Sequence, residues 1–273
     1  FVFDVVGPEN VLNGMAFLSL AMRTGGMIGA LVIGFILADF GAGAGYFVLA
    51  GGYLISAIVL SFIHSRGQAA PAGGSNMLKG LVEFWTELRH NSTVSALVIV
   101  VVFVEFFGFT TQALMPSFAR DVLDIGAEGL GVLTAVFSAG GMLGIFLVSV
   151  FGDIRRQGLV FIAVLHVFGV ALLALGFAPN IYVAIAIILV MAAMMALSDL
   201  FSQTLMQRLV PNDLRGRAMG AWTAAVGTAP VGNLEIGAVA SFFGVTVALV
   251  FHGAGLIVVA VITLAVFGKL RRV

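Results

Sequence analysis

Residues 245–267, VTVALVFHGAGLIVVAVITLAVF, form an apolar run that contains no Lys, Arg, Asp or Glu. A helix rises about 1.5 Å per residue and needs about 20 mostly apolar residues to cross a bilayer. Backbone polar groups cannot be left without partners in lipid, so a helix is the structure expected for such a run. Residues 245–267 are therefore predicted to span a membrane.

The rest of the chain repeats this pattern, so the sequence predicts an all-α polytopic membrane protein with about eight transmembrane helices. Hydrophobic residues make up 61% of the chain and charged residues 10%, whereas a soluble domain carries about 25% charged residues. The other seven predicted spans lie near 11–38, 44–63, 92–118, 129–151, 159–178, 181–206 and 216–243.

The first pair of spans resembles the last pair at an offset of 203 residues. Phe40-Gly41 recurs as Phe243-Gly244, and Pro8 recurs as Pro211. Ten positions are identical over an ungapped stretch of 50 residues, where this composition gives about four or five by chance. A second half that repeats the first in the same orientation is typical of a transporter.

A polar linker divides the spans unequally. Residues 64–77 are rich in Gly, Ala, Pro and Ser, as in a flexible linker. Residues 78–89 fit either a short interfacial helix or an extension of the next span. Two spans precede the linker and six follow it. We therefore expect 1–63 to be the remnant of an N-terminal six-helix bundle, 64–90 a cytoplasmic linker with an interfacial helix, and 91–273 a complete C-terminal bundle.

The basic residues predict the orientation, because cytoplasmic loops carry an excess of Lys and Arg. Under an alternating topology Arg120 lies alone on the outer side, and the C-terminus is cytoplasmic. This places the protein in the inner or plasma membrane, with the lipid bilayer as a partner. The other side receives Arg66, Lys79, Arg89, Arg155, Arg156, Arg208, Arg215, Arg217, Lys269, Arg271 and Arg272.

Four polar segments lie at the ends of these spans: VGPEN (6–10), MPSFARDVL (115–123), GDIRRQG (152–158) and LVPNDLRGRAM (209–219). In this order and at these spacings they resemble loops of the major facilitator superfamily, in its enterobactin-exporter-like and macrolide-efflux-like branch. The resemblance implies twelve helices in two six-helix bundles, a cavity between them and alternating access. The eight spans would be family helices five to twelve.

The cytoplasmic loop after the fourth predicted span resembles the family's basic loop motif, at Gly152, Asp153, Arg155 and Arg156. The resemblance implies that Asp153 holds one conformation of the carrier. Membrane anchoring alone explains the two arginines. The Arg pair at 215 and 217 has no counterpart in the first copy, where Leu12 and Gly14 stand. A symmetrical role for that pair is therefore in doubt.

Ionisable side chains inside spans are costly and mark candidate transport residues. Glu105 lies about 18 Å from the cytoplasmic edge by helical rise and shares a helical face with Gly108 and Gln112. We expect this face to line a wet cavity, where a desolvated carboxyl group could exchange a proton near neutral pH. The alternative is a carboxyl group held neutral by a neighbouring helix.

Asp199, Gln203 and Arg23 are further candidates for transport or proton coupling. Asp199 and Gln203 share a helical face with Ser202, and a structural pair of Asp199 with Arg208 is the simpler explanation. Arg23 precedes Gly25 in a stretch where the family often has Arg, and an anion contact and a structural pair remain open. Asn233 fits interhelical hydrogen bonding, and the role of Glu235 stays open.

Small residues at helical spacing predict close helix packing. The glycines concerned are Gly25, Gly29 and Gly34 in one span, and Gly140, Gly141 and Gly144 in another. The family resemblance implies that these two helices meet across the bundles. Ordinary core packing is the alternative for any single glycine.

The function expected is a secondary active transporter that exports small organic, drug-like or siderophore-like molecules by proton antiport. The sequence contains no nucleotide-binding P-loop, and we expect no enzyme activity, cofactor, metal site or nucleic-acid partner, and a monomer at full length. The alternatives are an intramembrane enzyme, in which Asp199 and His166 would converge, and a membrane scaffold with a dry interior.

Overall fold

The computed structural model describes residues 11–62, 86, 92–151, 156–209 and 215–266. Over these residues the regular structure is helical, without strands. The chain divides into two compact units, formed by residues 1–75 with 125–138 and by residues 76–124 with 139–273. Apart from Thr86, the predicted linker of residues 64–90 and its interfacial helix lie outside the described residues.

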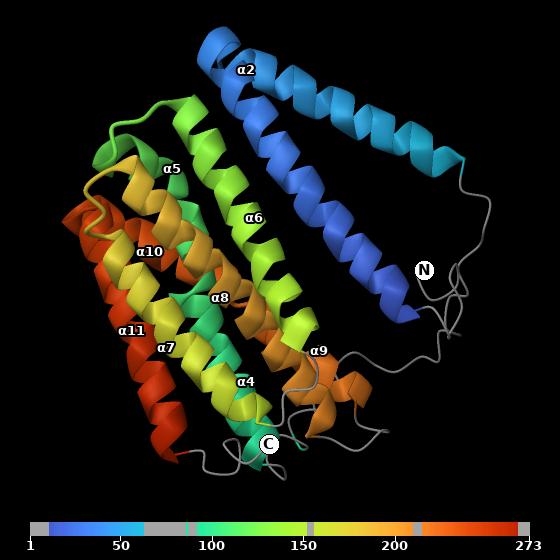
Figure 1. The fold of residues 1–273 in the computed structure, drawn as a ribbon, viewed down its shortest axis with the longest axis vertical. Helices are drawn as coiled ribbons and strands as arrows, with labels where there is room; N and C mark the ends of the chain where they lie inside the picture. The colour runs from blue at the N-terminus through green and yellow to red at the C-terminus, as the bar shows by residue number, and fades with distance from the viewer. Residues whose placement is uncertain (1–10, 63–85, 87–91, 152–155, 210–214, 267–273) are drawn as a thin grey trace. The chain divides into compact units, whose positions relative to one another are not determined.

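The smaller unit consists of α2 (Val11–Ser61) and the beginning of α6 (Ala127–Phe151). Gly41 interrupts α2 with φ 75° and ψ 178°, a conformation open essentially only to glycine. The two arms on either side of this kink form the hairpin seen in blue in Figure 1. They correspond to the predicted spans 11–38 and 44–63.

The larger unit contains the remaining helices and most of α6. Helix α7 packs against α8 and α11, and α10 packs against η2 and α11. Its elements are α4 (Ser92–Phe107), the 3₁₀ turn η2 (Phe109–Leu114), α5 (Met115–Ser117), the π turn η3 (Phe118–Val122), α7 (Gln157–Leu175), α8 (Ile181–Arg208), α9 (Arg215–Val226), α10 (Ala229–Phe243) and α11 (Val245–Val266).

The span that begins with α4 changes its helical form at Gly108. The hydroxyl of Thr110 donates to the carbonyl of Phe106 at 2.5 Å, and that of Thr111 donates to the carbonyl of Gly108 at 2.5 Å. Threonine hydroxyls that bond nearby carbonyls compete with regular α-helical bonding. The chain therefore continues to Val122 through 3₁₀, α and π turns, which the apolar pattern alone does not reveal.

Six helices of the described chain are long and apolar enough to cross a membrane unaided, compared with the eight predicted spans. One difference is that α2 counts once despite its two arms. The other is that the predicted span 216–243 is broken into α9 and α10, each too short alone. Pro230 stands in the first turn of α10, where it lacks the N–H that a continuous helix needs.

The turn between α10 and α11 has the same backbone conformation as the kink in α2. Gly244 adopts φ 91° and ψ 158°, close to the values of Gly41. These two glycines are the aligned pair of the 203-residue repeat. The repeat therefore extends to the conformation of the turn that joins each pair of helices.

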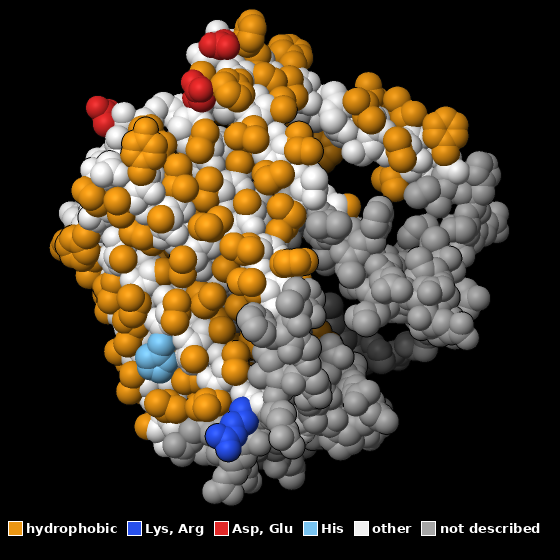
Figure 2. Space-filling view, in the orientation of Figure 1, with side chains coloured by type: hydrophobic (Ala, Val, Ile, Leu, Met, Phe, Trp, Pro, Cys, Tyr) orange, Lys and Arg blue, Asp and Glu red, His pale blue; other side chains and the backbone are white. Residues whose placement is uncertain are grey.

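The interior of the larger unit is apolar and tightly packed. Phe161, Phe168 and Leu172 of α7 are fully buried. The outward faces of α7 and α8 are also apolar, since Val167, Val170 and Val190 are exposed. Figure 2 shows a broad hydrophobic surface with acidic side chains at one end of the view. An exposed apolar surface of this kind fits contact with lipid.

Candidate functional site

A small void between α4, α7 and α8 brings together two predicted transport residues, Glu105 and Asp199. Glu105 is only 4% exposed. The void has no room for a water molecule. It is lined by Val101, Val104, Glu105, Phe109, Phe161, Ser198, Asp199 and Ser202.

The Glu105 carboxyl group is thus buried in a small, mainly apolar space in this structure, and the wet cavity expected from the sequence stays a prediction. Within the described chain no side chain forms a hydrogen bond with it. An ionised carboxylate in such a space lacks the solvation and counter-charge that would offset its burial.

Asp199 lies in a polar network on α8 that reaches α9. Gln203 Nε2 donates to Asp199 Oδ1 at 3.1 Å, and Ser202 Oγ donates to the Asp199 carbonyl at 2.9 Å. Trp222 Nε1 of α9 donates to Ser202 Oγ at 3.1 Å. Asp199 and Gln203, which the sequence places on one helical face, are thus joined by a hydrogen bond, and the bond from Trp222 to Ser202 ties α8 to α9.

Gln112 occupies a different environment from Glu105, although regular α-helical spacing predicts one helical face for both. The change to a 3₁₀ turn after Gly108 alters the direction of the following side chains. Gln112 is exposed, and its Nε2 lies 3.4 Å from Met195 Sδ of α8. The structure therefore brings Gln112 to α8 by a second contact, apart from the dry void.

Several predicted residues lie partly or wholly outside the described chain. Gly152, Asp153 and Arg155 of the loop motif are among the residues that the structure does not describe. Arg156 is exposed and precedes α7, and its carbonyl accepts from the N–H groups of Leu159 and Val160 at 3.1 Å each. Arg23 lies in α2, and its side chain is not described.

The predicted packing glycines fall into two groups. A Cβ at Gly140 would lie 2.5 Å from the Leu189 carbonyl oxygen, and one at Gly144 would lie 2.7 Å from that of Ala193, so α6 and α8 approach closely here. In the smaller unit, a Cβ at Gly34 would lie 2.9 Å from Gly131 Cα.

Gly25 and Gly29 have open space where a Cβ would lie, so no helix among the described residues packs closely at either position. A further close approach was not anticipated from the sequence. Gly169 of α7 and Gly253 of α11 meet so closely that a Cβ on either one would lie within 2.9 Å of the other's carbonyl oxygen.

His166 bonds within its own helix, where its Nδ1 lies 2.8 Å from the carbonyl oxygen of Ile162. Within the described chain, no three His, Cys, Asp or Glu side chains are grouped as a metal site would require.

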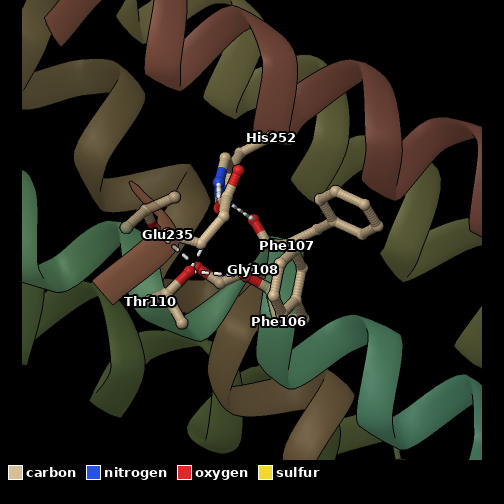
Figure 3. A network of polar contacts seen from close by, with 7 residues as sticks. Phe106, Phe107, Gly108, Thr110, Glu235 and His252 are labelled. Carbon is tan, nitrogen blue, oxygen red and sulfur yellow. Dashed lines mark hydrogen bonds and ion pairs between the residues drawn. The ribbon is translucent and has the colours of Figure 1, made fainter. Parts of the chain in front are cut away.

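A second polar cluster, missed in the sequence, joins His252 of α11 to Glu235 of α10. His252 Nε2 lies 2.9 Å from Glu235 Oε2, and Figure 3 shows the ring beside the end of α4. The spacing of the two residues in the sequence indicates this pair. Glu235 stands nine residues before Gly244 and His252 stands eight after it, so a tight helical hairpin brings them to the same depth.

A family model described as Major Facilitator Superfamily matches residues 1–227 and residues 97–272. The chain is 25% identical to the enterobactin exporter EntS of Salmonella typhi over 284 residues, which cover 98% of this chain and 64% of that protein. It is 23% identical to the uncharacterized MFS-type transporter YfmI of Bacillus subtilis, covering 94% of this chain and 65% of that one. The chain thus spans less than two thirds of the length of these relatives.

A solved structure has a similar fold. It is a bacterial homologue of the human lysosomal transporter Spinster, in an inward-facing and unoccupied conformation. The TM-score is 0.56 at 18% identity, and the match covers 97% of this chain and 71% of that one. This likeness supports the helical transporter fold and says nothing about substrate.

Proposed function

The chain belongs to the Major Facilitator Superfamily, and from this premise we propose that the protein is a secondary active transporter that exports small organic molecules in exchange for protons. The observation that carries this proposal is the pair of carboxyl groups, Glu105 and Asp199, on the dry void between α4 and α8. The family membership supports transport, and the buried pair supports protons as the coupling ion.

The proposed coupling rests on the burial of Glu105 in a void with no room for a water molecule. Water reaches such a carboxyl group only when the surrounding helices separate, so we expect proton exchange at Glu105 to accompany movement of α4 relative to α8. A change in the protonation of Glu105 also alters the free energy of its burial. Proton binding and the conformational change would thus drive each other.

Export of drug-like or siderophore-like molecules is supported by the resemblance to a protein named as an enterobactin exporter. The contact of Gln112 with Met195 supplies a polar and a flexible apolar side chain at the place where η2 meets α8. Such a combination suits contact with varied amphipathic molecules. We assign the protein to the inner membrane with a cytoplasmic C-terminus, on the distribution of Lys and Arg.

Transport measured in proteoliposomes tests this function. The intact protein is reconstituted, a pH gradient is imposed, and movement of enterobactin and of a fluorescent organic cation is followed. We expect gradient-driven transport that stops when a protonophore collapses the gradient. Glu105→Gln should lose this transport by about 100-fold, as expected when an essential proton carrier is removed.

Glu128→Gln is the matched control, because Glu128 is an exposed carboxylate in the first turn of α6. It should transport like the unmodified protein. Transport that persists after the gradient is collapsed would contradict proton coupling. Gradient-driven transport by Glu105→Gln at the normal rate would contradict the assignment of Glu105 while leaving the transporter function intact.

A further inference from the structure

The imidazole ring of His252 has a hydrogen-bond acceptor opposite each of its nitrogens. Nε2 lies 2.9 Å from Glu235 Oε2, and Nδ1 lies 3.2 Å from the backbone carbonyl oxygen of Phe107. The ring is fully buried, and the two partners come from α10 and from the end of α4. Figure 3 shows the ring between them.

This geometry determines how many protons the pair must hold so that no lone pair of a ring nitrogen faces a lone pair of an oxygen. A neutral imidazole has one N–H donor and one acceptor nitrogen, whereas a carbonyl oxygen and an ionised carboxylate only accept. With a neutral ring and an ionised Glu235, one ring nitrogen would face an oxygen with no hydrogen between them. One additional proton removes the conflict, either on the ring or on the Glu235 carboxyl group.

Thr110 supplies an alternative partner for the ring when that proton is absent. Its Oγ1 lies 3.5 Å from His252 Nδ1 and 2.5 Å from the Phe106 carbonyl, to which it donates. The hydroxyl has one hydrogen, so it can donate to the Phe106 carbonyl or to an unprotonated Nδ1. Loss of the proton from the pair would therefore draw the Thr110 hydroxyl away from the helical turn at Phe106.

The surroundings of His252 isolate the ring from other charges. Phe106 stacks on it at 6.0 Å between centroids, and Phe251 meets it edge-on at 5.8 Å. The titratable groups on the other packed elements are engaged elsewhere. His166 of α7 bonds the Ile162 carbonyl, Arg120 and Asp121 of η3 pair with each other, and Glu105 of α4 lines the void.

We propose that His252 and Glu235 form a proton-binding site distinct from the void at Glu105. Binding adds one hydrogen ion to an ionised Glu235 and a neutral His252, so that Nδ1–H donates to Phe107 and one proton lies between Nε2 and Glu235. No other covalent bond forms or breaks. Glu235 is the more exposed partner, since 29% of its side chain is exposed whereas His252 is not exposed.

Protonation of this site connects three helices. The protonated pair links α10 to α11 through Glu235 and His252, and links α11 to the carbonyl of Phe107 at the end of α4. The deprotonated pair lacks the Nδ1–H bond to Phe107. The site therefore links proton binding to the broken segment of the span that also carries Glu105.

Nitrogen-15 NMR of the intact protein, labelled at histidine, tests this proposal without any transport activity. The His252 signals are identified by their loss in His252→Asn, and His166→Asn serves as the control that should leave them in place. Between about pH 5 and pH 10, a range that covers histidine titration, we expect Nδ1 to carry a proton at the acidic end and the pair to release one proton as the pH rises.

Glu235→Gln gives the second readout. A glutamine amide can donate to Nε2 while Nδ1–H donates to Phe107, so a neutral ring satisfies every partner. We expect His252 in this variant to keep one form, with the proton on Nδ1, over the range in which the unmodified pair titrates. The proposal is overturned if Nδ1 of the unmodified protein is unprotonated throughout, or if Glu235→Gln titrates as the unmodified protein does. The first criterion holds even if the variant does not fold.

Discussion

Individual side chains gain their roles here from contacts between helices. Glu105 and Asp199 are far apart in the sequence, yet both line one dry void. Glu235 and His252 are 2.9 Å apart although they belong to different helices. Both clusters lie in the larger unit, and both contain ionisable groups inside apolar spans. Under the two proposals above, protonation acts on helix packing at these two clusters.

The hydrogen bond from Trp222 to Ser202 is predicted to stabilise the network around Asp199. Trp222→Phe keeps the aromatic volume and removes the Nε1–H donor. The expected cost is about 1 kcal/mol of unfolding free energy, the usual worth of a neutral hydrogen bond. Thermal or denaturant unfolding in detergent measures it.

A double-mutant cycle separates this bond from other effects of the same substitutions. Ser202→Ala removes the acceptor, so combining it with Trp222→Phe should cost less than the sum of the two single changes by about 1 kcal/mol. Strict additivity would show that the bond contributes nothing to stability.

At the scale of the helices, two glycines make the turns on which the internal repeat depends. Gly41 and Gly244 both combine a positive φ with a ψ near 160–180°, a region closed to side chains with a Cβ. A Cβ at either position would meet nothing within 4 Å. Backbone conformation and not space therefore explains why glycine stands there.

Gly41→Ala and Gly244→Ala are each predicted to destabilise the protein by about 1–3 kcal/mol, the cost of holding another residue in this backbone region. Melting temperatures in detergent report the effect. Gly43→Ala is the control, because Gly43 is helical and also has open space around it. If alanine at 41 and 244 were as harmless as at 43, the turns would not need glycine.

The sequence predicted most helices, because an apolar run of sufficient length has few other stable forms in lipid. It did not predict the break after Phe107 or the division between α9 and α10, because hydroxyl groups and a proline changed the backbone inside apolar runs. Glu105 and Asp199 were found as single candidates. Their convergence depends on how α4 packs against α8, which periodicity along one helix does not specify.

At the scale of the whole molecule, the family membership and the apolar helices describe a polytopic membrane protein with a transporter fold. The proposals add that the larger unit carries two proton-binding places, one within the span that begins with α4 and one that contacts this span from α10 and α11. Glu105 lies in α4, and the carbonyl that faces His252 belongs to Phe107 at its end. Movement of this span would alter both places together.

Proton movement driven by substrate tests the central claim most directly. Proteoliposomes holding the intact protein and a pH-sensitive dye receive a gradient of the organic molecule that the protein transports in the assay above, with no initial pH gradient. We predict that protons move opposite to the substrate, and that Glu105→Gln abolishes this movement while Glu128→Gln retains it. Substrate flux in the unmodified protein without any proton flux, or an unchanged proton flux in Glu105→Gln, would contradict the account.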